Sequence, residues 1–332
     1  MSITVTSTRF NTLQQRIAAI MGTATNAAPT TGYGQTISSS SVTGSGNQIN
    51  LSDVNKISSS DYENLYLDIA RARIHQIGAA AFSQTPFPVG DFTANTNADK
   101  VELSYIQFLE NLMNTIETNK FELDIPTQGE ILNLTNSSNQ NIQSVRTTTW
   151  GGAGQVQTIT HVFTVTFGSL TERRHFFNTG GQIRFEANLA YTGSEAKTLN
   201  WRNLLTNMGT ILFSADKTVS STGQGTGSNV GNYQITGSNT QLYRIDGTAV
   251  YSNNRYRVLA RNVSNTQIEF TVEFTDGAPL NTQFGIDETV RGTITSGPIR
   301  FARANGSATI NGINTVTVIN TETPVGNTTS NL

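Results

Sequence analysis

Apolar residues in the first third of the chain recur every three or four positions, which is the spacing of one face of an α-helix. The first of these stripes predicts a helix from about Ser7 to Met21. A second helix is expected to begin at the capping box Ser60–Glu63 and to end near Gly78, and a third to follow a similar start at Asp99–Glu102. The stripes are, in order, Phe10, Leu13, Ile17 and Ile20; Tyr62, Leu65, Ile69 and Ala72; and Tyr105 or Ile106, Leu109, Leu112 and Ile116.

Two polar stretches, residues 22–58 and 79–98, separate these helices. We expect both to be extended, with short strands around Gln35–Val42 and Gln48–Leu51 in the first. Polar arms of this kind can stay soluble alone and become ordered when they wrap around a neighbouring subunit. The two stretches are therefore predicted to be assembly arms.

Beyond residue 145 the spacing of apolar residues changes to every second position, the pattern of half-buried strands. A short amphipathic helix is expected over Thr198–Met208 and a flexible Gly/Ser-rich loop over residues 216–231. The predicted strands are His161–Phe167, Ile183–Leu189, Tyr233–Thr236, Gln241–Tyr251, Arg255–Asn262, Gln267–Thr275, Thr289–Ala302 and Ser307–Asn320. Many short strands separated by frequent turns favour a sandwich.

These patterns predict an α+β protein in which a helical N-terminal region with extended arms precedes an antiparallel β-sandwich, of the jelly-roll or immunoglobulin-like kind. We place the helical docking region at 1–124 and a polar linker at 125–145. The β-sandwich domain is expected to cover 146–320. Residues 321–332 are predicted to form a flexible tail.

The stretch Leu170–Leu189 is the most distinctive of the β-rich part. We interpret it as an irregular crossing with an aromatic pair, followed by a tight turn and a strand in the middle of a sheet. Residues Asn178–Gly181 supply the turn, because Asn and Gly tolerate positive φ angles.

Composition narrows the class of protein. Charged residues make up 13% of the 332 positions, the formal net charge is −2, and there is no cysteine. No global positive field is available to bind nucleic acid, and disulfides and thiolate metal sites are excluded. No apolar stretch approaches the length of a membrane span, and the N-terminus lacks the features of a signal peptide. We therefore expect assembly in a cytoplasm.

Residues that could carry catalysis do not fall into a known arrangement. The three histidines are far apart in sequence, and the run Gly223–Gly227 lacks the lysine of a phosphate-binding loop. Glu269 and Glu273 share one face of a strand but lie about 13–14 Å apart, too far for a glycosidase pair. Asp276 with Asp287 and Glu288 could bind calcium, although solvated turns are the better interpretation. We predict no enzyme activity, cofactor or metal.

The candidate site is the cationic and aromatic cluster Arg173, Arg174, Phe176 and Phe177, with Tyr33 in the first arm. In one interpretation the arginines pair with carboxylates of a neighbouring strand or subunit, while the two Phe residues point to opposite sides. In a second, the cluster is a subunit interface. In a third, it binds sugar or nucleic acid.

Several motifs resemble a family of virion structural proteins of tailed bacteriophages, known mainly from phages of cyanobacteria. The motifs are Gly32–Gln35, Ser59–Leu65, Arg71–Gly78, Phe176–Phe185, Asn200–Leu205 and Met208–Ile211. The resemblance covers well under half of the chain. It implies a place in the neck, tail or fibre region of a virion, and no enzyme activity.

The main hypothesis is thus a non-enzymatic virion component that assembles with copies of itself and with other virion proteins. A monomer whose arms fold back, with a deep polar cleft in the β-domain, would count against it. The alternative is an adhesin that binds host glycans through exposed Tyr233, Tyr243, Tyr251 or Tyr256. A weaker alternative, a polysaccharide depolymerase, requires two carboxylates within about 10 Å in a cleft.

Overall fold

The computed structural model describes residues 7–22, 32–42, 57, 59–82, 103–136, 138–151, 156–277, 289–304, 316–317 and 323–327. The chain divides into two compact units. The first comprises residues 1–130, 174–180 and 303–313, and the second comprises 131–173, 181–302 and 314–332. The boundary at Glu130 falls inside the predicted linker.

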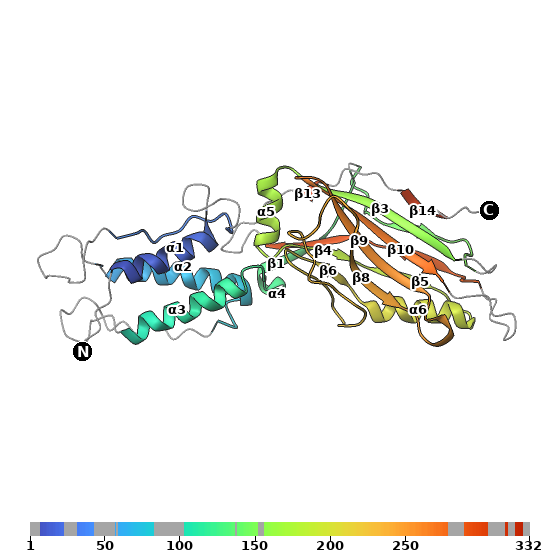
Figure 1. Cartoon of the computed structure of the whole chain (residues 1–332), viewed down its shortest axis with the longest axis horizontal. Helices are drawn as coiled ribbons and strands as arrows, with labels where there is room; N and C mark the ends of the chain where they lie inside the picture. Colours follow the sequence, from blue (N-terminus) through green and yellow to red (C-terminus); the bar gives the residue numbers. More distant parts are fainter. Residues whose placement is uncertain are drawn as a thin grey trace, which may run out of the picture. The chain divides into compact units, whose positions relative to one another are not determined.

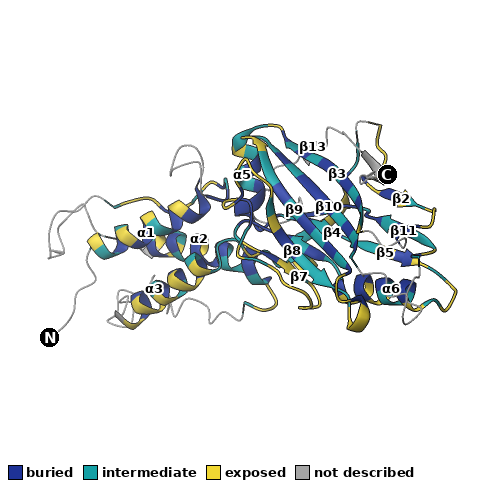
Figure 2. Ribbon diagram, turned by 45° about the vertical axis from the view of Figure 1, so that its right-hand side comes forward, coloured by how far each residue is buried: buried dark blue, intermediate teal, exposed yellow. Residues whose placement is uncertain are grey.

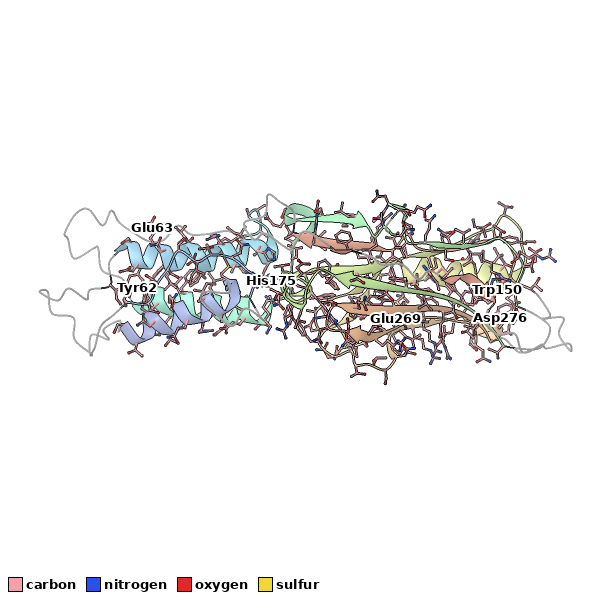
Figure 3. The ribbon with its side chains drawn as sticks, turned by 90° about the horizontal axis from the view of Figure 1, so that it is seen from above. Tyr62, Glu63, Trp150, His175, Glu269 and Asp276 are labelled. Carbon is pink, nitrogen blue, oxygen red and sulfur yellow. The ribbon has the colours of Figure 1, made fainter. Side chains whose placement is uncertain are left out.

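The first unit is built on three helices, and their predicted positions are confirmed (Figure 1). Each helix buries apolar side chains at alternating spacings of three and four, the a and d positions of a heptad. Figure 3 shows the result at the start of α2, where Tyr62 faces the other helices and Glu63 faces away. The helices are α1 (Ser7–Met21), α2 (Ser59–Ile77) and α3 (Leu103–Thr118), followed by the single turn α4 (Ile125–Gln128). The buried seam residues are Phe10, Leu13, Ile17 and Ile20; Tyr62, Leu65, Ile69 and Ala72; and Ile106, Leu109, Met113 and Ile116.

The three helices run parallel to one another. At their first turns, the rings of Phe10 in α1 and Tyr62 in α2 meet edge to face with centroids 5.2 Å apart. At the opposite end, Gln76 of α2 donates a hydrogen bond to the main-chain oxygen of Ile116 in α3, at 2.8 Å. Like ends of the helices therefore lie together.

Two heptad-spaced ion pairs join α1 to α3. Arg9 pairs with Glu110, and Arg16 pairs with Glu117 at 2.7 Å. If the seam residues occupy a and d, both arginines are at g positions and both glutamates at the e positions of the following heptad. This g-to-e pairing is characteristic of parallel coiled coils, where it selects the orientation of the helices.

The described part of the first arm, residues 32–42, is a return segment. Its direction is opposite to that of α1, since Tyr33 N bonds Ile20 O at 2.7 Å and Val42 N bonds the side chain of Asn11 at 2.8 Å. Asp68 of α2 accepts the amides of Ser38 and Ser39. The predicted strand over Gln35–Val42 is wrong, because these backbone groups bond to helices rather than to another strand. The strand predicted at Gln48–Leu51 lies outside the described residues.

The second unit contains three antiparallel sheets, in agreement with the predicted α+β class. One has the strand order β1-β12-β4-β6-β7, another β13-β3-β10-β9-β8 with β14 also on β3, and the third β2-β11-β5. The strands are β1 (Gly129–Asn133), β2 (Ser144–Arg146), β3 (Gln157–Phe167), β4 (Gln182–Phe185), β5 (Ala187–Ala190), β6 (Ile211–Phe213), β7 (Thr218–Ser220), β8 (Thr240–Asp246), β9 (Arg255–Ser264), β10 (Gln267–Asp276), β11 (Thr293–Ser296), β12 (Arg300–Ala304), β13 (Val316–Thr317) and β14 (Thr323–Asn327). The unit also holds α6 (Ala196–Met208), which was predicted, and the short 3₁₀ helix η2 (Ala249–Tyr251).

Aromatic side chains pack the five-stranded sheet against the six-stranded one. Phe270 of β10 lies 5.1 Å from Phe185 of β4 and 5.2 Å from Phe213 of β6, measured between ring centroids. Phe163 of β3 joins the same cluster, and α6 contributes Trp201, which contacts Phe274 at 6.2 Å. The alternation of buried and half-buried residues along β3 and β10 is visible in Figure 2. The period-two pattern therefore marks one inner face of the sandwich.

The stretch Leu170–Leu189 differs from its prediction. Its first half is a helix, α5 (Leu170–Asn178), and not an irregular crossing. Ser169 caps the helix by accepting the amide of Glu172 at 3.1 Å, and Gly180 ends it with a φ of 81°. The sequence Ser169-Leu-Thr-Glu172 is a capping box, a signal that would have predicted this helix. The predicted tight turn is thus the C-terminal cap of α5.

Several other predictions need correction. The predicted linker, 125–145, contains β1 and the first two residues of β2, so part of it belongs to the sheets. Residues Tyr233–Thr236 form no strand, and the strand predicted over Thr289–Ala302 is divided into β11 and β12. The tail is not wholly unstructured, since β14 pairs with β3. These elements depend on pairing with distant segments, which a local pattern does not record.

Candidate functional site

Three of the five predicted interface residues are buried aromatic side chains. Tyr33 is 1% exposed, donates its hydroxyl to the Lys120 carbonyl at 2.7 Å and accepts from Gln76 at 3.2 Å. Phe176 and Phe177 are 1% and 0% exposed, and their rings contact each other edge to face at 4.9 Å. A helix, unlike a strand, can direct two adjacent residues toward the same interior. The prediction that these side chains are available to a neighbouring subunit is wrong.

Arg173 is also buried, with 5% of its surface exposed. Its Nε donates to Asn232 at 2.7 Å and its Nη2 to Asn262 at 2.6 Å. Its Nη1 donates to the carbonyls of Ser264 and Asn265 at 3.2 and 3.4 Å. Burial lowers the pKa of Arg173 to about 10, so the guanidinium remains charged at neutral pH. Arg173 therefore ties α5 to the end of β9 and to the loop before β8. Of the two arginines, only Arg174, which is half-buried, keeps part of its predicted accessibility.

Two of the three histidines are buried in structural positions. His75 Nε2 lies 3.0 Å from the carbonyl oxygen of Thr179, and His161 Nδ1 lies 3.0 Å from the hydroxyl of Ser296. Burial lowers the pKa of each imidazole to about 4, because the charged form loses its hydration. Both rings are thus neutral at physiological pH and belong to the core.

Asp276 occupies neither a calcium loop nor a solvated turn, so both sequence-based interpretations of this residue are wrong. Its carboxylate lies 3.1 Å from Lys197 Nζ at the start of α6, and the two side chains are 1% and 2% exposed. Trp150 lies at the same end of the second unit (Figure 3), and its ring is 5.2 Å from that of Trp201. This is a buried ion pair that joins α6 to the end of β10. Asp287 and Glu288 lie outside the described residues.

The outer face of the six-stranded sheet carries the other carboxylates considered for catalysis. Glu269 pairs with Arg261 at 2.6 Å, and Glu273 pairs with Arg257. In both pairs the residues are direct cross-strand neighbours of β10 and β9. Such cross-strand pairs of opposite charge stabilise a sheet face.

The tyrosines proposed for glycan binding do not form an exposed group. Tyr243 and Tyr256 are fully buried, Tyr251 is 7% exposed, and only Tyr233, at 43%, offers a substantial surface. Tyr243 donates its hydroxyl to the carbonyl of Gln224 at 2.7 Å, which pins the Gly/Ser-rich loop to β8. The loop is therefore held against β8, and three of the four tyrosines are buried, which differs from both predictions.

The remaining candidate for contacts between chains is the outer edge of β3. Along one edge, β3 pairs with β10 through ten consecutive residue pairs. Along the opposite edge, which we call the outer edge, β3 forms two residue pairs with β13 and three with β14. The register with β14 is interrupted between Thr323 and Gly326. The longest strand of the second unit is therefore completed by short, discontinuous C-terminal segments. The strand predicted over Ser307–Asn320 contains β13, and the rest of that range lies outside the described residues. The sequence did not indicate that β13 and β14 pair with β3.

Comparisons with known proteins add no further assignment. No protein-family model, curated protein or solved structure matches the chain. Within the described ranges, no three potential metal-ligating side chains gather into a cluster. None of the helices in the described part of the chain is long and apolar enough to cross a membrane.

Proposed function

We propose that this chain is a non-enzymatic structural component of a tailed-phage virion, located in the neck, tail or fibre region and assembled with copies of itself and with other virion proteins. The virion assignment rests on the sequence motifs that resemble phage structural proteins. It implies assembly in the cytoplasm of the host.

One observation carries the non-enzymatic part of the proposal. The side chains that offered chemistry in the sequence serve internal structure instead: Asp276 is paired with Lys197, Glu269 and Glu273 with arginines, and His75 and His161 are buried and neutral. Carboxylates paired with cations inside the fold and imidazoles buried in the neutral form are poorly placed to exchange protons with a substrate, which supports a structural role. These side chains stabilise the β-sandwich and the helical bundle, and neither fold depends on cysteine oxidation.

The predicted binding of the first arm to a neighbouring subunit does not support this proposal. Residues 32–42 pack on α1 and α2 of the same chain, so the described part of the first arm serves the chain's own fold. This folded-back arm is one of the two features expected to count against an assembly role. The protein–protein contacts must therefore be sought elsewhere, and the outer edge of β3 is the candidate.

The direct test is a reconstruction and mass-spectrometric analysis of purified particles of the phage that encodes the chain. The expected result is the chain at a fixed copy number in the neck, tail or fibre, in contact with itself or other virion proteins. Absence from the particle, together with hydrolysis of host polysaccharide by the purified chain, would contradict the proposal.

A further inference from the structure

We propose that Lys197 and Asp276 condense to an isopeptide bond, an amide that covalently joins a side chain of α6 to a side chain of β10 within the second unit. Lys197 Nζ lies 3.1 Å from Asp276 Oδ2, and the two side chains are 2% and 1% exposed. This inference goes beyond the proposed function and does not depend on it. It concerns a modification that the chain carries out on itself.

Both charged side chains occupy positions of the apolar core. On α6, Lys197 lies one turn before Trp201, and both are on the buried face of the helix. On β10, Asp276 lies two residues after Phe274, so the two share the buried face of the strand. The rings of Trp201 and Phe274 contact each other with centroids 6.2 Å apart. The ion pair is therefore flanked by aromatic side chains and removed from bulk water.

The chain before β3 covers the carboxylate from another side. Gly151 has a φ of 75°, and a Cβ placed on it would overlap Asp276 Oδ2. The glycine thus allows the backbone to pack directly against the carboxylate. Trp150 lies at the same end of the second unit as Asp276 (Figure 3), and its ring is 5.2 Å from that of Trp201. These contacts keep out the water that would hydrolyse an amide at this place.

The reaction needs no reagent beyond the pair itself. A proton passes from the ammonium group of Lys197 to the carboxylate of Asp276, which leaves a neutral amine and a carboxylic acid. The amine nitrogen attacks Cγ of Asp276, so that a C–N bond forms and the bond from Cγ to one carboxyl oxygen breaks. That oxygen leaves as water with two of the three ammonium protons, and the third stays on the amide nitrogen. No atom is oxidised or reduced.

Two physical effects favour this condensation. Reacting groups that are held in contact behave as if they were present at effective concentrations of about 10⁵–10⁸ M. The burial of two charges also carries a desolvation cost, and a neutral amide removes it. The bond would connect positions that are 79 residues apart in sequence. A chain without cysteine has no disulfide with which to make such a connection.

Mass spectrometry of the full-length protein, kept at neutral pH after purification, tests the proposal. The mass should be lower than that of the sequence by one water molecule. Trypsin should fail to cleave after Lys197, and the digest should contain residues 185–202 joined by an amide to residues 262–291. A protein with the full mass of its sequence, cleaved normally after Lys197, would overturn the proposal.

Two lysine substitutions locate the loss of water. Lys197→Arg keeps the positive charge but removes the amine, because a guanidinium stays protonated. It should have the full mass of its sequence and migrate more slowly in a denaturing gel than the parent, whose closed loop makes the unfolded chain more compact. Lys120→Arg is the matched control and should keep the loss of water, since that amine lies over the ring of Phe121.

The bond between Asp276 and Gly277 supplies the competing explanation, because an Asp-Gly sequence can lose water by itself through a cyclic imide. A loss of water that persists in Lys197→Arg, or that accompanies normal cleavage after Lys197 in the parent, would assign it to this imide and contradict the isopeptide bond. If Lys197→Arg does not fold, the digest of the parent protein decides between the two.

Discussion

Arg173 and Arg174 are adjacent in sequence and differ in what surrounds them. The guanidinium of Arg173 is enclosed by two asparagine side chains and two carbonyl groups, whereas Arg174 is half-buried. The pair of arginines first suggested a binding surface. In the fold, one of the two acts as a bridge inside the second unit.

Substitution of the two arginines should therefore have unequal effects. Arg173→Ala leaves buried hydrogen-bonding groups unsatisfied, and we expect it to lower the free energy of unfolding by about 3 kcal/mol. Arg174→Ala, the matched control, should change it by less than about 1 kcal/mol. Urea denaturation followed by circular dichroism measures both. Equal losses, or weakened assembly with unchanged stability in Arg173→Ala, would contradict this assignment.

Buried histidines make stability depend on pH in a defined direction. The pKa of His75 is about 4 in the folded protein and about 6.5 in an unfolded chain. As pH falls through this window, the unfolded state gains a proton that the folded state excludes, so stability present at neutral pH is lost. The loss should approach about 3 kcal/mol for this group.

The variant His75→Gln tests this linkage, because the amide can still donate to the carbonyl of Thr179 but does not titrate. The free energy of unfolding, measured in urea at pH 7 and pH 4.5, should fall by about 2 kcal/mol less in the variant than in the parent protein. An identical loss in both proteins would show that His75 does not set the pH dependence.

At the scale of elements, the bundle combines parallel helices with a described return segment, residues 32–42, between α1 and α2. An extended chain rises about 3.3 Å per residue and a helix 1.5 Å, so ten residues suffice to travel back along a helix of 15. Residues 33–42 do this beside α1. The low apolar content of this segment suggested a free arm. Residues 33–42 are instead attached mainly through hydrogen bonds of their backbone.

The ion pairs between α1 and α3 should help to select this parallel arrangement. Arg16→Glu sets two negative charges against each other, and we expect a loss of about 1 kcal/mol in the free energy of unfolding. The exchange Arg16→Glu/Glu117→Arg should restore most of that loss, with the Arg9–Glu110 pair unchanged as an internal reference. The difference should shrink in 1 M NaCl, where charges are screened. A double variant no more stable than the single one would exclude the pairing.

At the scale of the whole molecule, each of the two units is built from segments that are not consecutive in the sequence. Residues 174–180 belong to the helical unit although the flanking chain belongs to the β-rich unit. Thr179 bonds His75 of α2, and a side chain on Gly180 would approach the Cβ of Leu123 to 2.5 Å. The end of α5 is therefore a structural part of the helical unit.

A pair of glycine substitutions tests this arrangement. Gly180 and Gly223 both have positive φ angles, but a Cβ at Gly223 would meet nothing within 4 Å. Gly223→Ala should cost about 1 kcal/mol from backbone strain alone. Gly180→Ala should cost about 3 kcal/mol, since a close contact is added to the same strain. Hydrogen exchange should show that Gly180→Ala loosens α2; a loss confined to β3 and β10 would contradict the assignment.

The sequence alone determined the elements whose signals are local. The heptad-like stripes placed α1, α2 and α3, and alternation placed β3, β9 and β10, because burial of one face imposes a period on neighbouring residues. It also predicted the α+β class. α5 had a local signal in its capping box, which the surrounding strand pattern obscured.

Only the tertiary structure decided which residues are accessible and what each charged group contacts. Arg173, Tyr33 and Asp276 look like surface chemistry in the sequence and are buried in the fold. Their partners lie tens of residues away along the chain, as Asn232, Gln76 and Lys197 show. Contacts between distant segments depend on the topology of the fold, which the local spacing of apolar residues does not specify. The same reason explains why the edge of β3, and not the predicted cluster, is the surface to test for assembly.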